Sequence, residues 1–205
     1  MQNLICTRQN LPHILENDIF SDRRRQFVDR LQWDLCLTRT GHEVDEYDDA
    51  ESTYLVVHKH DKHMGSCRVR PTTSSTMVTD HFYDSFPDAP HFLRMQKGKL
   101  YELTRFCRSP DISSGQSKEM LRQLCLLLDG FRTQKKLSGF IAVVFPKVAR
   151  FMDTIGMRYI VISDAIVNGQ PTYLICITQA ASQTAVINDG VNDFSKALTP
   201  AMMAA

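Results

Sequence analysis

The chain has 205 residues, and its 24 Lys and Arg nearly balance its 23 Asp and Glu, which leaves a net charge of +1. That length favours a single domain with room for a substantial core, and the near-neutral charge excludes a global affinity for nucleic acids or other polyanions. No apolar run approaches the roughly 20 residues that span a bilayer, and the N-terminus does not look like a signal peptide. Six scattered cysteines without a C-x-x-C pair argue against structural zinc and a disulfide framework. We therefore expect a cytoplasmic protein with mostly buried, reduced thiols.

Hydrophobic periodicity divides the chain into alternating helices and strands. The predicted elements are a helix over 18–35, a hairpin of strands over 53–58 and 64–70, a strand over 100–107, a helix over 117–134, a strand over 139–145, a helix over 146–155, and strands over 159–163 and 172–178. Helices packed on a central mixed sheet account for this order, which is an α/β (α+β) fold. Apolar periodicity stops near residue 180, so we expect one domain over 1–180 and an accessory or weakly ordered tail over 181–205.

The first predicted helix carries Arg23, Phe27 and Trp33. Phe27 lies one turn after Arg23 on the same face of a regular helix. A flat aromatic wall beside a guanidinium can hold an adenine ring, or a cationic sulfonium by cation–π attraction. The alternative is that the aromatic side chains enter the core while the arginines stay solvated.

An acidic segment follows, in which five of the seven residues from Glu43 to Asp49 are acidic. Such a segment is by default a solvated loop. Loops also carry many binding residues, so Asp45 and Asp48 are candidates to bind the positive end of an amino-acid substrate.

Ionisable residues also lie inside predicted strands, namely Arg68 in the hairpin and Glu102 with Arg105 in the next strand. An arginine in a central strand is unusual unless its charge is paired. Glu102 and Arg105 are three residues apart, which puts them on opposite faces of a regular strand. Both can reach one cleft only if the strand has a bulge or a bend.

Together these residues form a pattern whose combined spacing is specific. The pattern is Arg23-x3-Phe27-x5-Trp33, Glu43-x-Asp45-x-Tyr47-Asp48, Gly65-x2-Arg68-x2-Pro71-Thr72, Phe82-x3-Phe86-Pro87 and Glu102-x2-Arg105, followed by a later helix with Met152-Asp153 and Ile155-Gly156-Met157. Over residues 5–178 the chain resembles the acyl-homoserine-lactone synthases of the LuxI type, the autoinducer synthases of bacterial quorum sensing. Met157 departs from that family, in which tryptophan is frequent at this position.

The resemblance implies a GNAT-like fold, with a splayed mixed central sheet flanked by helices. It implies an acyltransferase of the bacterial cytoplasm whose substrates are S-adenosylmethionine and an acyl thioester of acyl carrier protein or coenzyme A. The products are then an N-acyl-homoserine lactone, 5′-methylthioadenosine and the free thiol, with no separate cofactor, metal, nucleic acid or membrane partner. Glu102 is the candidate proton acceptor for the amine, and Arg68 and Arg105 organise charge beside it. The residues expected to bind S-adenosylmethionine are Arg23, Phe27, Trp33, Asp45 and Asp48.

The acyl chain needs an apolar slot. The candidates are Leu103, Phe106, Leu124, Ile141, Ala142, Val143, Phe145, Phe151, Met152 and Ile175, all of which can equally be ordinary core residues. In this family a threonine near position 142 often accompanies 3-oxo acyl groups, so Ala142 and its apolar neighbours indicate an acyl group unsubstituted at C3. A basic landing area for an acidic carrier protein draws on Lys97, Lys99, Lys147 and Arg150, which can also be uncommitted surface charges.

Other functions have weaker support. His58, His60 and His63 favour a polar hairpin turn over a metal site, because no acidic or cysteine partner recurs at ligand spacing. A generic GNAT-type N-acyltransferase usually has a Gly-x-x-Gly element for the pyrophosphate of coenzyme A, and this chain has none. A non-catalytic module that binds S-adenosylmethionine or an acyl thioester does not need Glu102 and Arg105 together.

Overall fold

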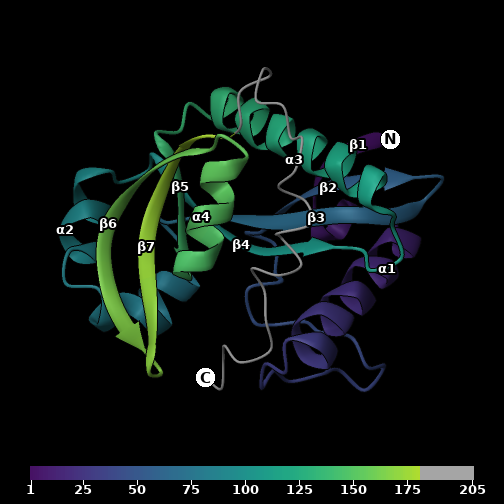
Figure 1. Ribbon diagram of the computed structural model, residues 1–205, viewed down its shortest axis with the longest axis horizontal. Helices are drawn as coiled ribbons and strands as arrows, with labels where there is room; N and C mark the ends of the chain where they lie inside the picture. The colour runs from purple at the N-terminus through teal and green to yellow at the C-terminus, as the bar shows by residue number, and fades with distance from the viewer. Residues whose placement is uncertain (181–205) are drawn as a thin grey trace.

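The computed structural model describes residues 1–180, so the predicted tail over 181–205 lies outside the described residues. A single mixed sheet has the strand order β1-β2-β3-β4-β5-β7-β6 (Figure 1). Its strands are β1 (Gln2–Thr7), β2 (Thr53–Lys59), β3 (Lys62–Pro71), β4 (Leu100–Arg108), β5 (Gly139–Val144), β6 (Arg158–Val167) and β7 (Gln170–Gln179). The helices are α1 (His13–Arg23), α2 (Ala89–Met95), α3 (Ser114–Gln134) and α4 (Pro146–Thr154), with short 3-10 helices η1 (Arg8–Asn10) and η4 (Tyr83–Ser85) and π-helices η2 (Arg24–Arg30) and η3 (Val78–Phe82).

The helices cover both faces of the sheet. Side chains alternate along β2, so that Leu55 and Val57 pack with α3 while Tyr54 and Val56 pack with α1. Helix α4 shares the face of α3, as Figure 1 shows, and α2 packs on the face of α1. The predicted arrangement of helices on a mixed central sheet is confirmed.

Strands β4 and β5 form the one parallel pair in the described sheet, and they stay paired for only three residues. The pairing runs from Leu100 opposite Gly139 to Glu102 opposite Ile141, and the two strands then diverge. Beyond Glu102 the sheet is therefore open between β4 and β5, which creates a gap through its middle.

Strand β4 carries a bulge at Arg105, as the candidate site requires. Its register against β3 shifts by one residue between the pairs Ser66–Cys107 and Arg68–Thr104. Arg105 has a φ of 51°, in the left-handed region that non-glycine residues rarely adopt. The extra residue turns the Arg105 side chain so that it shares a site with side chains from the Glu102 face.

Several predicted boundaries were wrong for identifiable reasons. The first helix begins at His13, and after Arg23 it continues as the π-helix η2, so the regular helix is shorter than predicted. Helix α3 begins at Ser114, because its N-cap Ser113 and its third residue Gln116 form a capping box. Strand β1 was not predicted, since as an edge strand it buries few side chains, and α2, η3 and η4 lie in a segment without clear periodicity.

Two glycines offer a matched test of the packing around β5. A Cβ on Gly139 would lie 2.5 Å from the carbonyl oxygen of Ile177 in β7, whereas one on Gly130 in α3 would meet nothing within 4 Å. We expect Gly139→Ala to destabilise the protein by roughly 1–3 kcal/mol through overpacking. Gly130→Ala should stabilise it by about 0.5–1 kcal/mol, because alanine favours a helix interior. Chemical denaturation measures both, and equal effects of the two substitutions would contradict this packing.

Candidate functional site

A closed ring of ion pairs joins three arginines and three carboxylates on the α1 side of the sheet. We call it the ionic ring, and its members in order are Arg23, Glu43, Arg105, Asp45, Arg68 and Asp48. Each carboxylate lies between two guanidiniums and each guanidinium lies between two carboxylates. Four of the closest N–O distances in the ring are 2.5 Å for Arg23–Glu43, 2.8 Å for Arg23–Asp48, 2.8 Å for Arg68–Asp48 and 2.8 Å for Arg105–Asp45.

The ionic ring is buried, and this sets its electrostatics. Arg23 and Arg68 are both 1% exposed. Burial alone would raise the pKa of the Asp48 carboxyl, but the charges of Arg23 and Arg68 and the hydrogen bonds from Arg23 and Tyr54 hold that pKa well below its usual range. The Tyr54 hydroxyl donates to Asp48 Oδ1 over 2.6 Å. The formal charges of the three guanidiniums and the three carboxylates cancel.

The aromatic wall is built by the π-helix η2 and the turn after it. Gln32 has a φ of 57°, and the Trp33 N–H donates to the Phe27 carbonyl over 2.9 Å, which folds Trp33 back onto Phe27. Their rings stack with centroids 4.9 Å apart and an interplanar angle of 11°. The guanidinium beside this wall comes from Arg105, which lies 5.7 Å from the Phe27 centroid, whereas Arg23 lies over Phe20.

Glu102 is 2% exposed, and both of its carboxylate oxygens accept backbone hydrogen bonds. The donors are the N–H groups of Met77, at 3.1 Å, and Val78, at 2.7 Å. Burial raises the pKa of the Glu102 carboxyl, while these two N–H groups and the charge of Arg68 oppose the shift. The result is a carboxyl with a raised pKa, the state that general-base catalysis near neutral pH uses.

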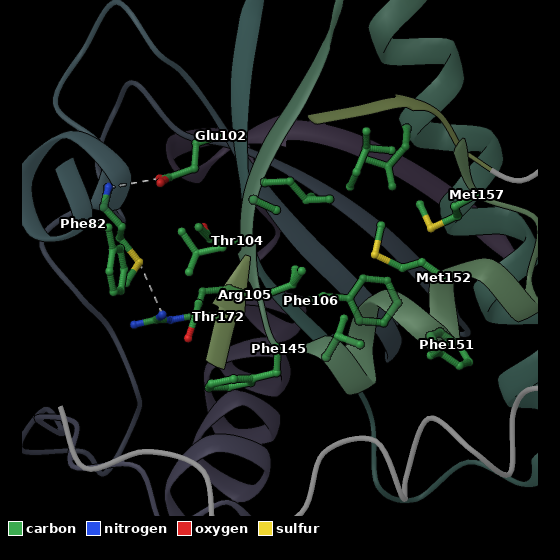
Figure 2. A pocket seen from close by; sticks show the side chains of 18 of the residues that line it. Phe82, Glu102, Thr104, Arg105, Phe106, Phe145, Phe151, Met152, Met157 and Thr172 are labelled. Carbon is green, nitrogen blue, oxygen red and sulfur yellow. Dashed lines mark hydrogen bonds between the residues drawn. The ribbon is translucent and has the colours of Figure 1, made fainter. Parts of the chain in front are cut away.

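A cavity of about 230 Å³ passes through the gap between β4 and β5. One side of the sheet contributes polar and aromatic groups, among them Phe82, Glu102 and Arg105, and the other contributes apolar side chains such as Phe151 and Met152 (Figure 2). The lining residues are Phe27, Trp33, Met77, Phe82, Glu102, Leu103, Thr104, Arg105, Phe106, Leu121, Cys125, Leu128, Ala142, Val143, Val144, Phe145, Val148, Phe151, Met152, Ile155, Met157, Val167, Thr172 and Ile177.

Comparison with known proteins places the chain in a family. The sequence profile of the autoinducer synthases matches residues 8–186. The chain belongs to the autoinducer synthase family. An acyl-homoserine-lactone synthase of Vibrio anguillarum is 30% identical over 156 residues, which cover 74% of this chain and 78% of that protein. One of Rhizobium etli is 36% identical over 121 residues, or 55% of each chain. The predicted family and the predicted acyltransferase class are confirmed.

Solved structures of the family share the fold. TofI in a ternary complex with an inhibitor and MTA has a TM-score of 0.68 at 22% identity, covering 88% of this chain and 94% of TofI. BjaI, a CoA-dependent acyl-homoserine lactone synthase solved with SAM and isopentyl-CoA, has a TM-score of 0.68 at 18% identity, covering 97% of this chain and 89% of BjaI. A putative N-acetyltransferase from Lactobacillus plantarum has a TM-score of 0.55 at 15% identity, covering 87% of this chain and 97% of that chain. The predicted GNAT-like fold is confirmed.

In this autoinducer synthase the predicted site residues fall into two groups. Arg23, Asp45, Asp48, Arg68 and Arg105 meet in the ionic ring. Phe27, Trp33, Glu102 and Arg105 line the cavity. Arg105 belongs to both groups and so connects the ring to the cavity.

Of the predicted acyl-pocket residues, some line the cavity and others do not. Seven of them line the cavity, namely Leu103, Phe106, Ala142, Val143, Phe145, Phe151 and Met152. Leu124, Ile141 and Ile175 are not among the lining residues. Leu124 and Ile175 are fully buried in the core beneath α3 and α4, and Ile141 packs on the opposite face with Leu100 and Leu174.

The four predicted docking residues are exposed at two separate places. Lys147 and Arg150 lie on α4, directly after the end of β5, where the sheet is open. Lys97 and Lys99 lie before β4, and the Lys99 carbonyl accepts the N–H of Ser138 just before β5. The two pairs therefore flank opposite ends of β5 and do not form one patch.

The histidine cluster is split by the hairpin. Its turn residues His60 and Asp61 have φ values of 50° and 57°. His63 is buried, with Nδ1 2.8 Å from Asp22 Oδ2 and Nε2 3.0 Å from Ser66 Oγ. Over residues 1–180 no group of three or more His, Cys, Asp or Glu side chains is arranged to hold a metal ion, and no helix there is long and apolar enough to cross a membrane.

Sequence reasoning missed several members of the site. Glu43 completes the ionic ring; it stands in the acidic segment and in the family pattern, but it was not chosen as a site residue. Leu121, Cys125 and Leu128 line the cavity as a stripe at helical spacing on α3. Met77 reaches the cavity from a segment whose sequence carries no periodic signal.

The ionic ring makes stability depend on pH. The pKa of Asp48 is lower in the folded protein than the ordinary aspartate value of about 4. Below that pH, Asp48 of the unfolded chain binds a proton while Asp48 of the folded protein stays ionised. The free energy of unfolding therefore decreases as the pH falls. We expect Asp48→Asn to lower the free energy of unfolding at pH 7 by about 3–5 kcal/mol, because the buried ring then carries one positive charge in excess, and to flatten the acid-side pH dependence.

Asp111→Asn is the matched control, since Asp111 pairs with Arg25 at the surface with 71% of its side chain exposed. Asp111→Asn should lower the free energy of unfolding by less than about 1 kcal/mol. Denaturant titrations from pH 7 down to pH 3 measure both variants. If Asp48→Asn keeps the acid-side slope of the unsubstituted protein, Asp48 is not the source of that slope.

Proposed function

We propose that this autoinducer synthase transfers an acyl group from a thioester to the amine of S-adenosylmethionine and then releases an N-acyl-homoserine lactone and 5′-methylthioadenosine. The observation that carries the proposal is that a buried carboxylate and an apolar cavity meet at the gap between β4 and β5. Family membership supports the same reaction. S-adenosylmethionine is a substrate in this scheme, and no separate cofactor is required.

The S-adenosylmethionine side lies at the aromatic wall. Phe27 and Trp33 offer a flat surface for the adenine or the sulfonium, and the Arg105 guanidinium suits the substrate carboxylate. Asp45 keeps 13% of its side chain exposed whereas Asp48 is fully enclosed. Asp45 is therefore the carboxylate that meets the positive end of the substrate, and Asp48 acts by holding arginines in place.

Acyl transfer requires a neutral amine. In the proposed step Glu102 accepts a proton from the substrate ammonium, directly or through water, and the amine attacks the thioester carbonyl. The C–N bond forms, the C–S bond breaks, and the thiolate leaves and takes up a proton. Beyond Glu102 and Ile141 the facing edges of β4 and β5 no longer pair, so backbone N–H groups there can stabilise the oxyanion.

Lactonisation needs little further machinery. The carboxylate of the acylated substrate attacks its own γ-carbon, and 5′-methylthioadenosine leaves with the electrons of the C–S bond. The sulfonium is already a good leaving group, so holding the carboxylate in line is the main requirement. We assign that role to Arg105, with Arg68 keeping the adjacent Asp45 in place.

The acyl chain occupies the apolar part of the cavity, between α3 and α4. Ala142, Val143 and Val144 lack a hydroxyl, and the Thr172 hydroxyl already donates to the Gln170 carbonyl. Thr104 accepts from Arg68 Nε and so lies beside the ionic ring, on the polar side of the cavity. These features support an acyl group unsubstituted at C3.

The thioester donor is proposed to be acyl carrier protein. Lys147 and Arg150 are exposed on α4, near Phe145 and Val148, which line the cavity. A carrier docked there can deliver its thioester to the gap, and its acidic surface complements the two cations. All six cysteines lie within residues 1–180 and are thiols there, which agrees with a cytoplasmic setting.

The decisive experiment incubates the protein with S-adenosylmethionine and a panel of acyl-carrier and acyl-CoA thioesters, and follows 5′-methylthioadenosine by chromatography. We expect release with at least one donor, and a lactone whose mass matches an unsubstituted acyl group. Glu102→Gln should lower kcat by about 100-fold or more, the scale of general-base catalysis, with S-adenosylmethionine binding retained by calorimetry. The control Glu119→Gln removes an exposed carboxylate of α3 and should retain full activity.

The outcomes separate the alternatives. Acylation of another amine without release of 5′-methylthioadenosine would identify a generic N-acyltransferase. Binding of S-adenosylmethionine without turnover of any thioester would identify a binding module. A fully active Glu102→Gln variant would remove Glu102 as the proton acceptor.

Charge reversal tests the docking surface. We expect Lys147→Glu with Arg150→Glu to raise the KM for the carrier by roughly 5- to 30-fold, which corresponds to two surface charge pairs of about 0.5–1 kcal/mol each. The KM for S-adenosylmethionine should stay the same. Lys97→Glu with Lys99→Glu is the matched pair at the other end of β5 and should leave both constants unchanged. A larger effect from the Lys97 and Lys99 pair would move the docking surface to that end.

A further inference from the structure

Two oppositely charged residues on neighbouring strands both reach one loop at the mouth of the cavity. Arg70 on β3 lies directly opposite Glu102 on β4 in the strand register. The mouth loop, residues 72–85, connects β3 toward α2 and contributes Met77 and Phe82 to the cavity lining. Glu102 accepts the N–H groups of Met77 and Val78, and Arg70 Nε donates to the Ser75 carbonyl over 2.5 Å. Arg70 thus binds the carbonyl of Ser75, and Glu102 binds the N–H groups two and three residues after Ser75.

Arg70 is itself held by the acidic loop, which we define as residues 43–52. Its two terminal nitrogens bind both carboxylate oxygens of Asp49, with 2.9 Å between Nη2 and Oδ2. Nη1 also lies 3.4 Å from the Tyr47 carbonyl and 3.3 Å from Ser52 Oγ. Arg70 is 5% exposed and is not a member of the ionic ring. One buried guanidinium therefore ties the acidic loop to the mouth loop.

Weaker contacts link the same two loops. The Tyr47 hydroxyl donates to Asp80 Oδ2 over 3.0 Å, and the Ser74 hydroxyl donates to Glu51 Oε2 over 3.2 Å. On the inner side of the mouth loop, Met77 Sδ lies 3.7 Å from Arg105 Nη1. The loop is thus fixed on its outer side by the acidic loop and on its inner side by the cavity residues.

We propose that Arg70 is a positioning residue that, together with Asp49, clamps the mouth loop over the cavity and keeps the Met77 and Val78 N–H groups on Glu102. The effect of this clamp on catalysis rests on the proposed function, whereas the existence of the clamp does not depend on it. Asp49 keeps 44% of its side chain exposed, so the pair adds little to global stability. A bidentate pair does fix geometry, and here it fixes the position of the mouth loop.

Hydrogen exchange tests the clamp without any assay of activity. We expect the Met77 and Val78 amides to exchange at least about tenfold faster in Arg70→Met, with a smaller increase in Asp49→Asn, which keeps the bond to the Ser75 carbonyl. Arg70→Lys should give an intermediate rate, because lysine offers the charge without the fork. Amides in β2 and β7 should be unchanged in all three variants. The control Arg122→Met removes a bidentate pair with Glu119 on the surface of α3 and should not affect the mouth loop.

Loss of the clamp should also change the pH dependence of kcat. The Met77 and Val78 N–H groups lower the pKa of Glu102, so releasing them should raise it further and shift the acid limb of the kcat profile to higher pH. Arg70 lies opposite Glu102 in the strand register, but the charges that shift the pKa of Glu102 are those of Arg68 on β3 and Asp45 of the acidic loop, and substitution of Arg70 leaves both in the ionic ring. We expect kcat to fall about tenfold at pH 7, with partial rescue by Arg70→Lys.

Two results would overturn the inference. Exchange at Met77 and Val78 that matches the unsubstituted protein in Arg70→Met would show that Arg70 does not hold the loop. Faster exchange with an unshifted pH profile and an unchanged kcat would show that the loop does not act on Glu102. If the unsubstituted protein releases no 5′-methylthioadenosine, the proposed function fails, and the exchange measurement alone decides on the clamp.

Discussion

The ionic ring is the constraint on which the rest of the site depends. It joins residues 23 to 105 in sequence and brings together α1, the acidic loop, β3 and the bulge of β4. Six charges are taken out of water, which costs several kcal/mol per ion unless each one is paired. Because every member lies between two partners of opposite sign, no element can shift without exposing an unpaired charge. The ring thereby fixes the direction of its guanidiniums before any substrate arrives, and electrostatic preorganisation requires this.

The bulge at Arg105 and the gap after Glu102 lie on the same stretch of β4 and together shape the site. A regular β4 would place Arg105 on the face opposite Glu102, out of reach of Glu43 and Asp45. The left-handed backbone at Arg105 costs of order 1 kcal/mol or more, and two ion pairs within the ring offset it. The same stretch of β4 has already separated from β5, so its side chains can enter the cavity instead of packing against a neighbouring strand.

Sequence alone predicted much of this arrangement, and its failures have physical causes. The hairpin, the buried β5 and the helix before β5 carried strong periodicity, and Arg68 inside a strand implied a charged partner. Spacing along the chain cannot tell which carboxylate meets which guanidinium, since the ring is closed by long-range contacts. Periodicity marked the buried face of α3 but not the part of it that borders the gap, so Leu124 was chosen where Leu121 and Cys125 line the cavity. The π-helix η2 could not be predicted from the sequence, although it and the turn after it stack Trp33 on Phe27.

The two faces of the sheet divide the chemistry between them. Charge, the aromatic wall and the Glu102 carboxylate lie on the α1 side, whereas the apolar part of the cavity lies under α3 and α4. A polar, cationic reactant and an apolar chain can therefore approach from opposite faces and meet where the strands separate. The apolar part of the cavity is lined by side chains of the core on that face, such as Leu128 and Met152. Under the proposed function, we expect substitutions there to change which acyl chain is accepted and to leave the buried charges in place. Changes in the mouth loop act on Glu102 directly, because that loop supplies the two N–H groups on its carboxylate.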